Sequence, residues 1–198
     1  ARDGEVIALD PASGRVKWSQ DTKADLAAGP GVGASLVAVG TSDGKVIALD
    51  VASGKVLWQA SVSSEVLSAP LVTGDRVIVR SVDGRVHALD ALTGKSQWTG
   101  EEPVPKLSLR GTAPPVLAKD NVIAGFDSGK VIAFAVATGD IVWQAQVTTP
   151  GGRSELERLA DVDSTVQVDG NDAFAVGYQG RVVMIALDSG QVWWNREL

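Results

Sequence analysis

The chain repeats one arrangement of glycine and tryptophan five times along its 198 residues. In each unit a second glycine follows the first by ten positions, and a tryptophan follows the second glycine by four. Successive tryptophans are 40, 40, 45 and 51 residues apart. The five units are Gly4/Gly14/Trp18, Gly44/Gly54/Trp58, Gly84/Gly94/Trp98, Gly129/Gly139/Trp143 and Gly180/Gly190/Trp194. A fixed period of this length is typical of repeat folds and therefore constrains the fold more than chain length does.

Each unit predicts a β-hairpin, because short apolar segments such as VIALD and KVLW flank a turn of the form Asp-x-x-Ser/Thr-Gly. The glycine takes the positive φ angle of the turn, and the aspartate side chain accepts hydrogen bonds from turn N–H groups. Alanine replaces that aspartate at Ala135 and Ala186, so the aspartate helps the turn without being indispensable. Two further strand candidates precede each complete hairpin, and no segment shows a helical period. Four short strands per repeat predict an all-β fold, a β-propeller of four-stranded antiparallel blades with Trp-docking hairpins.

The tryptophan stands at a fixed place in the last strand of each unit. We interpret it as a wedge packed against the neighbouring blade, where burial of one large aromatic ring contributes about 2 kcal/mol or more. An aromatic binding cage is the alternative interpretation. His87 replaces Ile47 and Ile132 in the aligned strand, and we interpret it as a strand residue and not a ligand.

The units divide the chain 1–198 into four complete blades and one leftover hairpin. The expected blades span 24–60, 64–100, 107–145 and 160–198, and the hairpin spans 1–20. Because the last unit already ends on its own final strand, the hairpin finds no missing strands at the other terminus. We therefore expect an incomplete ring, about half of a larger propeller, whose flanks expose strand edges and apolar surface.

Composition excludes several classes of function. The net charge of −6 and the isoelectric point near 4.8 argue against a nucleic-acid partner, which needs a basic surface. The chain has no cysteine and one histidine, which argues against thiol catalysis, a catalytic triad and a His- or Cys-ligated metal. No apolar run in residues 1–198 is long enough to span a membrane, and none has the form of a signal peptide. Because residue 1 falls inside a repeat, we expect a piece of a longer protein, from which any N-terminal address was lost with the rest. We expect no enzyme activity, no cofactor and no metal.

The variation in spacing is confined to one class of connector, between each tryptophan and the next inner strand. Two of these connectors, 99–115 and 148–165, are enlarged and belong to neighbouring blades. Equivalent loops of a propeller lie on one face, and repeat folds often bind partners there. The second connector carries a capping-box pattern at Ser154 and Glu157, which predicts one or two helical turns over 155–160.

Alignment of the repeats places Asp25, Glu65, Arg110 and Asp161 at equivalent positions, and Arg110 is the one cation among them. One interpretation is an ion pair between Arg110 and Asp161 that braces the two loops, worth about 0–1 kcal/mol if exposed. The other is a mixed-charge patch, with Leu107 and Leu109 as apolar anchors, that binds another protein. The residues alone do not favour either.

The hairpin motif, the segment LSLRG and the segment ERLADVDST resemble the BamB family, propeller lipoproteins of the bacterial outer-membrane β-barrel assembly (Bam) machinery. The resemblance covers the whole chain and implies about half of an eight-bladed ring. It implies a non-enzymatic scaffold that binds the periplasmic POTRA domains of BamA and assists insertion of outer-membrane proteins. The implied contact residues are Leu107, Leu109, Arg110, Asp161 and Asp163. It also implies a periplasmic location at the inner face of the outer membrane, through an N-terminal lipid anchor that lies outside this sequence.

Two alternatives remain beside this scaffold. Quinoprotein (PQQ-dependent) dehydrogenases share similar tryptophan hairpins, but the acidic residues here form no calcium-loop pattern, and ADVDST offers only two carboxylates. A periplasmic ligand-sensor domain is the other alternative. Unfolded outer-membrane proteins are a further class of partner for the scaffold, by addition of a strand to a blade edge, although no acceptor strand is singled out by the sequence.

Overall fold

The computed structural model describes residues 4–109, 112–149, 151, 154, 159–178 and 180–197. The described residues form one two-stranded sheet and four four-stranded sheets. In chain order the strands are β1 (Glu5–Leu9), β2 (Val16–Asp21), β3 (Gly31–Val32), β4 (Leu36–Gly40), β5 (Lys45–Asp50), β6 (Val56–Ser61), β7 (Leu71–Val72), β8 (Arg76–Arg80), β9 (Arg85–Asp90), β10 (Ser96–Glu101), β11 (Val116–Ala118), β12 (Asn121–Gly125), β13 (Lys130–Ala135), β14 (Ile141–Gln146), β15 (Gln167–Asp169), β16 (Asp172–Gly177), β17 (Arg181–Ala186) and β18 (Val192–Glu197).

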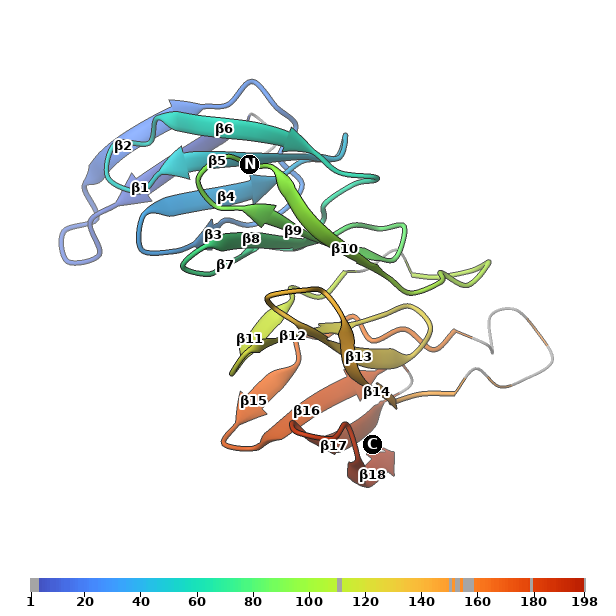
Figure 1. Ribbon diagram of the computed structural model, residues 1–198. Helices are drawn as coiled ribbons and strands as arrows, with labels where there is room; N and C mark the ends of the chain where they lie inside the picture. Colours follow the sequence, from blue (N-terminus) through green and yellow to red (C-terminus); the bar gives the residue numbers. More distant parts are fainter. Residues whose placement is uncertain are drawn as a thin grey trace.

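Each sheet is an antiparallel meander in which neighbouring strands follow one another in the chain. The sheets succeed one another from the β1–β2 hairpin to the β15–β18 sheet, and the arrangement does not close (Figure 1). The predicted all-β fold of propeller blades in an incomplete ring is confirmed. No helix is assigned to the described residues, and none of them forms a helix that is long and apolar enough to cross a membrane. Of the helical turns predicted over 155–160, residues 155–158 lie outside the described residues, and 159–160 are not helical.

The hairpin turns form as their sequence predicts. Oδ1 of Asp50 accepts hydrogen bonds from the main-chain N–H of Ser53, at 2.7 Å, and from its hydroxyl group. The same bonds join Asp10 to Ser13 and Asp90 to Thr93. The turn glycines have positive φ angles, 73° at Gly54 for example, a conformation that costs glycine little. Local chemistry therefore fixes the turn of the three hairpins that carry this aspartate.

The core lies between consecutive sheets. The middle strands are buried along almost their whole length, because the central residues of β4, β5, β12 and β13 have neighbouring sheets on both sides. Four clusters of buried apolar residues fill the spaces between adjacent sheets, and each cluster draws on the two sheets that flank it. Radial packing of this kind makes each sheet depend on its neighbours for burial.

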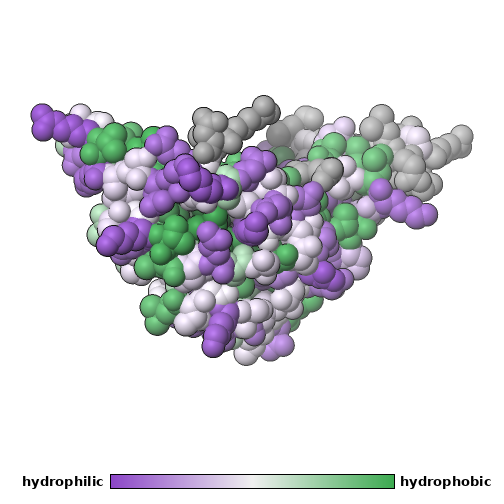
Figure 2. All heavy atoms as spheres, turned by 90° about the horizontal axis from the view of Figure 1, so that it is seen from above, coloured by the Kyte–Doolittle hydropathy of each residue, from purple (hydrophilic) through white to green (hydrophobic). Residues whose placement is uncertain are grey.

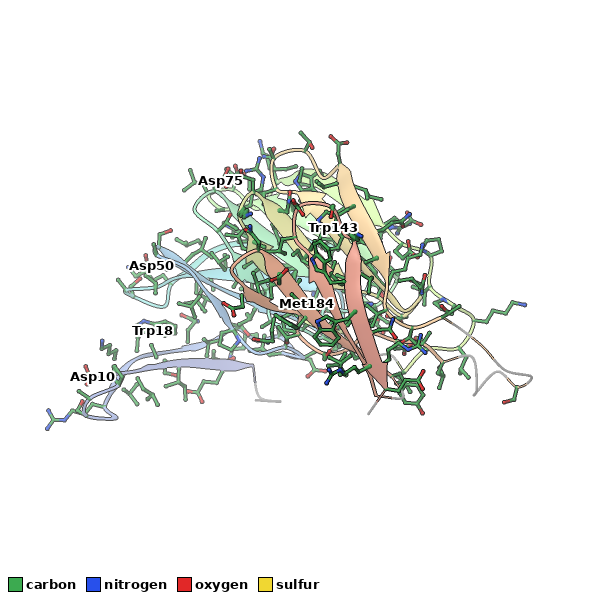
Figure 3. All side chains as sticks on the ribbon, turned by 90° about the horizontal axis from the view of Figure 1, so that it is seen from below. Asp10, Trp18, Asp50, Asp75, Trp143 and Met184 are labelled. Atoms are coloured by element: carbon green, nitrogen blue, oxygen red, sulfur yellow. The ribbon has the colours of Figure 1, made fainter. Side chains whose placement is uncertain are left out.

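Four tryptophans lock each sheet to the next. Their indole Nε1–H groups donate to the main-chain oxygen that follows the turn aspartate or alanine of the next hairpin: Trp18 to Val51, Trp58 to Ala91, Trp98 to Val136 and Trp143 to Leu187, at 2.7–3.0 Å. Each ring covers the turn glycine of that hairpin, Gly54, Gly94, Gly139 and Gly190 in the same order. Figure 3 shows Trp18 beside the turn that carries Asp50. The predicted wedge role is confirmed for these four residues.

The two flanks of the arc differ from its interior. Trp194 is 40% exposed and makes no indole hydrogen bond to the described residues, because no sheet of this chain follows β18. Likewise no atom lies within 4 Å of the Cβ position at Gly14, the turn glycine of the first hairpin. Ile7, Leu9 and Val16 of that hairpin are also exposed. Seen from above Figure 1, the molecule presents apolar side chains in several groups between polar ones (Figure 2).

Candidate functional site

The described parts of both enlarged connectors lie on the same side of the arc (Figure 1). One joins β10 to β11 and spans 102–115; the other joins β14 to β15 and spans 147–166. Because β10 and β14 are equivalent strands of adjacent sheets, the connectors leave those sheets at the same end. The shared face that the sequence predicted for these loops is present in the structure.

The second connector is anchored to two sheets by its segment 161–162. The main-chain oxygen of Asp161 accepts a hydrogen bond of 2.7 Å from the N–H of Tyr178, which follows β16. The N–H of Val162 donates to the oxygen of Phe126, after β12, at 3.1 Å. The Val162 side chain is fully buried against Gly125, where an added Cβ would meet Val162 atoms at 2.5 and 2.7 Å. A glycine at 125 is therefore required for the connector to approach β12.

The same backbone bond recurs in the other repeats. Asp25 accepts from the N–H of Ser42, and Glu65 accepts from the N–H of Val82. In each case the acceptor precedes the donor by 17 residues, as Asp161 precedes Tyr178. The predicted equivalence of positions 25, 65 and 161 is confirmed, whereas Arg110 lies outside the described residues. The ion pair with Asp161, one of the two interpretations of Arg110, therefore remains untested.

The two connectors meet at Leu109 and Asp161. The N–H of Leu109 donates a hydrogen bond of 2.5 Å to Oδ2 of Asp161. Asp161 is 1% exposed, whereas Leu107 and Leu109 are 43% and 47% exposed. The buried carboxylate holds the main chain of the first connector, and the two leucines are left at the surface.

Sequence reasoning missed a buried ion pair beneath this junction. Arg80, the last residue of β8, is fully buried and donates a charge-assisted hydrogen bond from Nη2 to Oδ1 of Asp127, which is 3% exposed. The guanidinium also lies 5.1 Å from the centroid of the Phe126 ring, in cation–π geometry. The pair joins the β7–β10 sheet to the β11–β14 sheet. The available signal was that Arg80 stands where Gly40 and Gly125 stand in the equivalent strands.

The surroundings of Asp161 and Asp163, in the second connector, disfavour the ionised form of their carboxyl groups. Burial raises the pKa of Asp161, and the negative charge of Asp127 adds to this, while the Leu109 N–H and Arg80 oppose it. Burial raises the pKa of Asp163 to about 6, with further contributions from the charges of Asp161 and Asp127. The Oδ1 atoms of both residues are buried and have no hydrogen-bond partner among the described residues.

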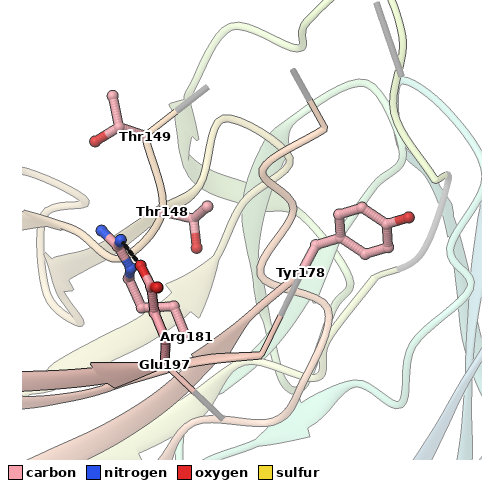
Figure 4. Close-up of a pocket in the computed structure, with 5 residues that line it drawn as sticks. All are labelled: Thr148, Thr149, Tyr178, Arg181 and Glu197. Carbon is pink, nitrogen blue, oxygen red and sulfur yellow. Dashed lines mark hydrogen bonds and ion pairs between the residues drawn. The ribbon is translucent and has the colours of Figure 1, made fainter. Parts of the chain in front are cut away.

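Two pockets border Tyr178. One, of about 210 Å³, is lined by Leu109, Asp161, Asp163, Ser164, Val176, Gly177 and Tyr178. The other, of about 260 Å³, is lined by Thr148, Thr149, Tyr178, Arg181 and Glu197. Figure 4 shows the Arg181 guanidinium paired with Glu197 in the second pocket, and the Tyr178 ring pointing away from that pair. The first pocket therefore combines the unsatisfied carboxylates with an exposed ring.

Comparison with known proteins identifies the family. The family model described as outer membrane protein assembly factor BamB matches residues 2–198. The chain is 57% identical to a BamB of Pseudomonas aeruginosa and 52% identical to one of Kangiella koreensis, in each case over 98% of this chain. The chain belongs to the BamB family.

The chain spans about half the length of its BamB relatives, 51% of the Pseudomonas protein and 50% of the Kangiella protein. The crystal structure of BamB from Moraxella catarrhalis matches all of this chain with a TM-score of 0.93 at 30% identity, over 60% of that protein. The arc of sheets is accordingly a part of a larger BamB propeller.

The BamB fold is shared with enzymes. A quinohemoprotein alcohol dehydrogenase from Pseudomonas putida HK5 matches the whole chain with a TM-score of 0.76 at 19% identity, a likeness of fold alone. Among the described residues no group of three or more His, Cys, Asp or Glu side chains is arranged to hold a metal ion. Calcium sites take about six to eight oxygen ligands, and among the described residues Asp161 and Asp163 form no such carboxylate group with a third acidic side chain.

Proposed function

We propose that this BamB-family chain is a non-enzymatic scaffold subunit in the assembly of outer-membrane β-barrel proteins, and that it binds the periplasmic POTRA region of BamA. The proposed contact residues are Leu107, Leu109, Arg110, Asp161 and Asp163. The observation that carries the proposal is the hydrogen bond between the Leu109 N–H and Asp161, because it joins the two enlarged connectors into one surface. The names of the relatives support the assembly role.

The chemistry of this surface suits a protein partner. Leu107 and Leu109 are exposed apolar side chains on a loop whose backbone is held in place. A rigid apolar anchor loses little conformational freedom on binding and removes apolar area from water, which favours protein association. Asp163 borders the same surface and supplies charge. We assign Asp161 a positioning role, because its carboxylate is buried and faces Leu109.

The same proposal places the protein in the periplasm, at the inner face of the outer membrane, and the relatives' name as outer membrane assembly factors supports this. Unfolded outer-membrane proteins are a second proposed class of partner. An enzyme of the quinoprotein class is disfavoured, since the described residues offer no metal cluster and the likeness to those enzymes is below 20% identity.

Binding to a purified POTRA region of BamA tests the proposal. We expect Leu107→Ser combined with Leu109→Ser to weaken binding by about tenfold or more, because both anchors are lost. Leu92→Ser is the matched control: Leu92 is 87% exposed and lies in the β9–β10 turn, at the opposite end of β10 from the connector. Circular dichroism and thermal unfolding check that all variants fold. Equal binding by the double variant and the control contradicts the proposed surface.

A further inference from the structure

The pocket between the connectors is lined by two aspartates, Asp161 and Asp163, whose Oδ1 atoms accept no hydrogen bond from the described residues. Asp161 is 1% exposed and lines the pocket, yet its Oδ1 atom has no hydrogen-bond partner among the described residues. The buried Oδ1 of Asp163 is in the same state. Buried polar atoms in proteins are almost always hydrogen-bonded, and an exception requires an explanation. Two carboxylate oxygens are thus shielded from water without a donor from the described part of the chain.

The charge around these oxygens is also unbalanced. The charged groups of the described chain that act on Asp163 are Asp161, Asp127 and Arg80. Arg80 already donates to Asp127. When ionised, three carboxylates and one guanidinium leave two negative charges in a largely buried setting. A positive group that enters the pocket therefore gains favourable electrostatic energy at low effective dielectric.

The walls of the pocket fit a long aliphatic stem with a charged end. Leu109 and Val176 are exposed apolar side chains at 47% and 39% exposure, and Tyr178 is 38% exposed. Lysine and arginine side chains pack their methylene stems against apolar groups and keep the charged end for polar partners. A tyrosine ring adds cation–π attraction for such a group. The volume of about 210 Å³ is enough for one such side chain and excludes a folded element.

We propose that this pocket receives a lysine or arginine side chain of the partner protein, with its charged end beside the Asp163 carboxylate. An acidic side chain is repelled there, and an apolar one leaves the Asp163 carboxylate without a positive partner. No group of three or more His, Cys, Asp or Glu side chains among the described residues is arranged to hold a metal ion there. The inference rests on the proposed function for the identity of the partner, but the chemistry of the pocket is independent of it.

Calorimetric titration with the POTRA region of BamA tests the inference in the complex. At pH 7.5 we expect Asp163→Asn to weaken binding by about tenfold or more, because a partly buried charge pair is lost. Asp169→Asn removes the same charge from the other end of β15, and we expect a change within about twofold. Wild-type affinity should fall as the pH is lowered through about 6, whereas the Asp163→Asn affinity stays level. Equal effects of the two substitutions overturn the inference.

A small probe tests the pocket without the partner. We expect n-butylguanidinium to shift the NMR signals of Asp163 and Tyr178 saturably in the wild-type chain and not in Asp163→Asn, with n-butanol as the neutral control. The absence of a wild-type response overturns the inference. A response that appears only in Arg110→Ala also overturns it, because Arg110 of the chain itself is then the occupant. Failure of the POTRA region to bind, with a normal probe response, contradicts the proposed function and not the pocket.

Discussion

The N–H of Leu109 lies 2.5 Å from Oδ2 of Asp161, which follows it by 52 residues. This bond joins the loop ahead of β11, which carries the exposed Leu107 and Leu109, to the loop ahead of β15. A residue expected to contact a partner thus supports the loop that carries the contacts.

Asp161→Ala should release the first connector, because the Leu109 N–H loses its acceptor. Net loss of one such bond to a charged group costs about 1.5–3 kcal/mol, so we expect the amide of Leu109 to exchange with deuterium at least about tenfold faster. Asp161→Asn retains an oxygen acceptor and should keep Leu109 protected. Equal protection in both variants contradicts the positioning role.

Asp163→Asn should stabilise the chain at neutral pH. The folded state holds the proton up to about pH 6, whereas the unfolded carboxyl releases it near its usual pKa of 3.8. Stability therefore falls as the pH rises from about 4 to 6, and ionised Asp163 destabilises the fold above that range. The full shift corresponds to about 3 kcal/mol, and partial exposure to solvent reduces the expected gain to about 1 kcal/mol. Urea unfolding at pH 7.5 should show this gain, and at pH 4 it should vanish. A gain of the same size at both values excludes titration as its cause.

Trp143→Ala should be far more destabilising than Trp194→Ala. Trp143 is 6% exposed, bonds the Leu187 oxygen at 2.7 Å and covers Gly190, so its removal should cost about 3–5 kcal/mol. Trp194 occupies the equivalent strand position without a following hairpin, and its loss should cost about 1 kcal/mol. Chemical denaturation measures both. Similar losses for the two variants are incompatible with the inter-sheet lock.

Gly54→Ala and Gly14→Ala separate backbone strain from packing. Both glycines have φ near +70°, so alanine should cost about 1–2 kcal/mol at either position. A Cβ at Gly54 would lie 2.5 Å from the Trp18 ring, whereas no atom lies within 4 Å at Gly14. We expect an additional loss of about 1–3 kcal/mol at Gly54, measured as the difference between the two melting curves. No difference indicates that the ring moves aside freely.

Arg80→Met should destabilise the chain by about 3–5 kcal/mol, because it leaves the Asp127 carboxylate buried without its partner. The double variant Arg80→Met/Asp127→Asn should lose less than the sum of the single losses, since the uncompensated charge is then absent. A double-mutant cycle in urea measures the coupling. Additive losses would falsify the view that the two groups act as a pair.

The sequence predicted the blades because their determinants are local. Each hairpin contains its own turn glycine with positive φ, its turn residue and, four residues after the glycine, its tryptophan. An alignment of the chain with itself therefore reveals this pattern. The equivalence of Asp25, Glu65 and Asp161 followed from the same count. The burial of Asp161 could not be predicted in this way, because an acidic residue in a loop is ordinarily exposed.

By itself, then, the sequence determined the strands, the turns, the tryptophan locks and the side of the sheets on which long connectors emerge. Each of these depends on residues that are near in the chain or one repeat apart. Only the tertiary structure decided that the Arg80–Asp127 ion pair acts on Asp161 and Asp163, and that these two carboxylates line a pocket with Tyr178, since the residues lie far apart in the chain and share no spacing. Packing of neighbouring sheets brings these residues together. Burial there raises the pKa of Asp163 and holds Asp161 where it accepts the Leu109 N–H.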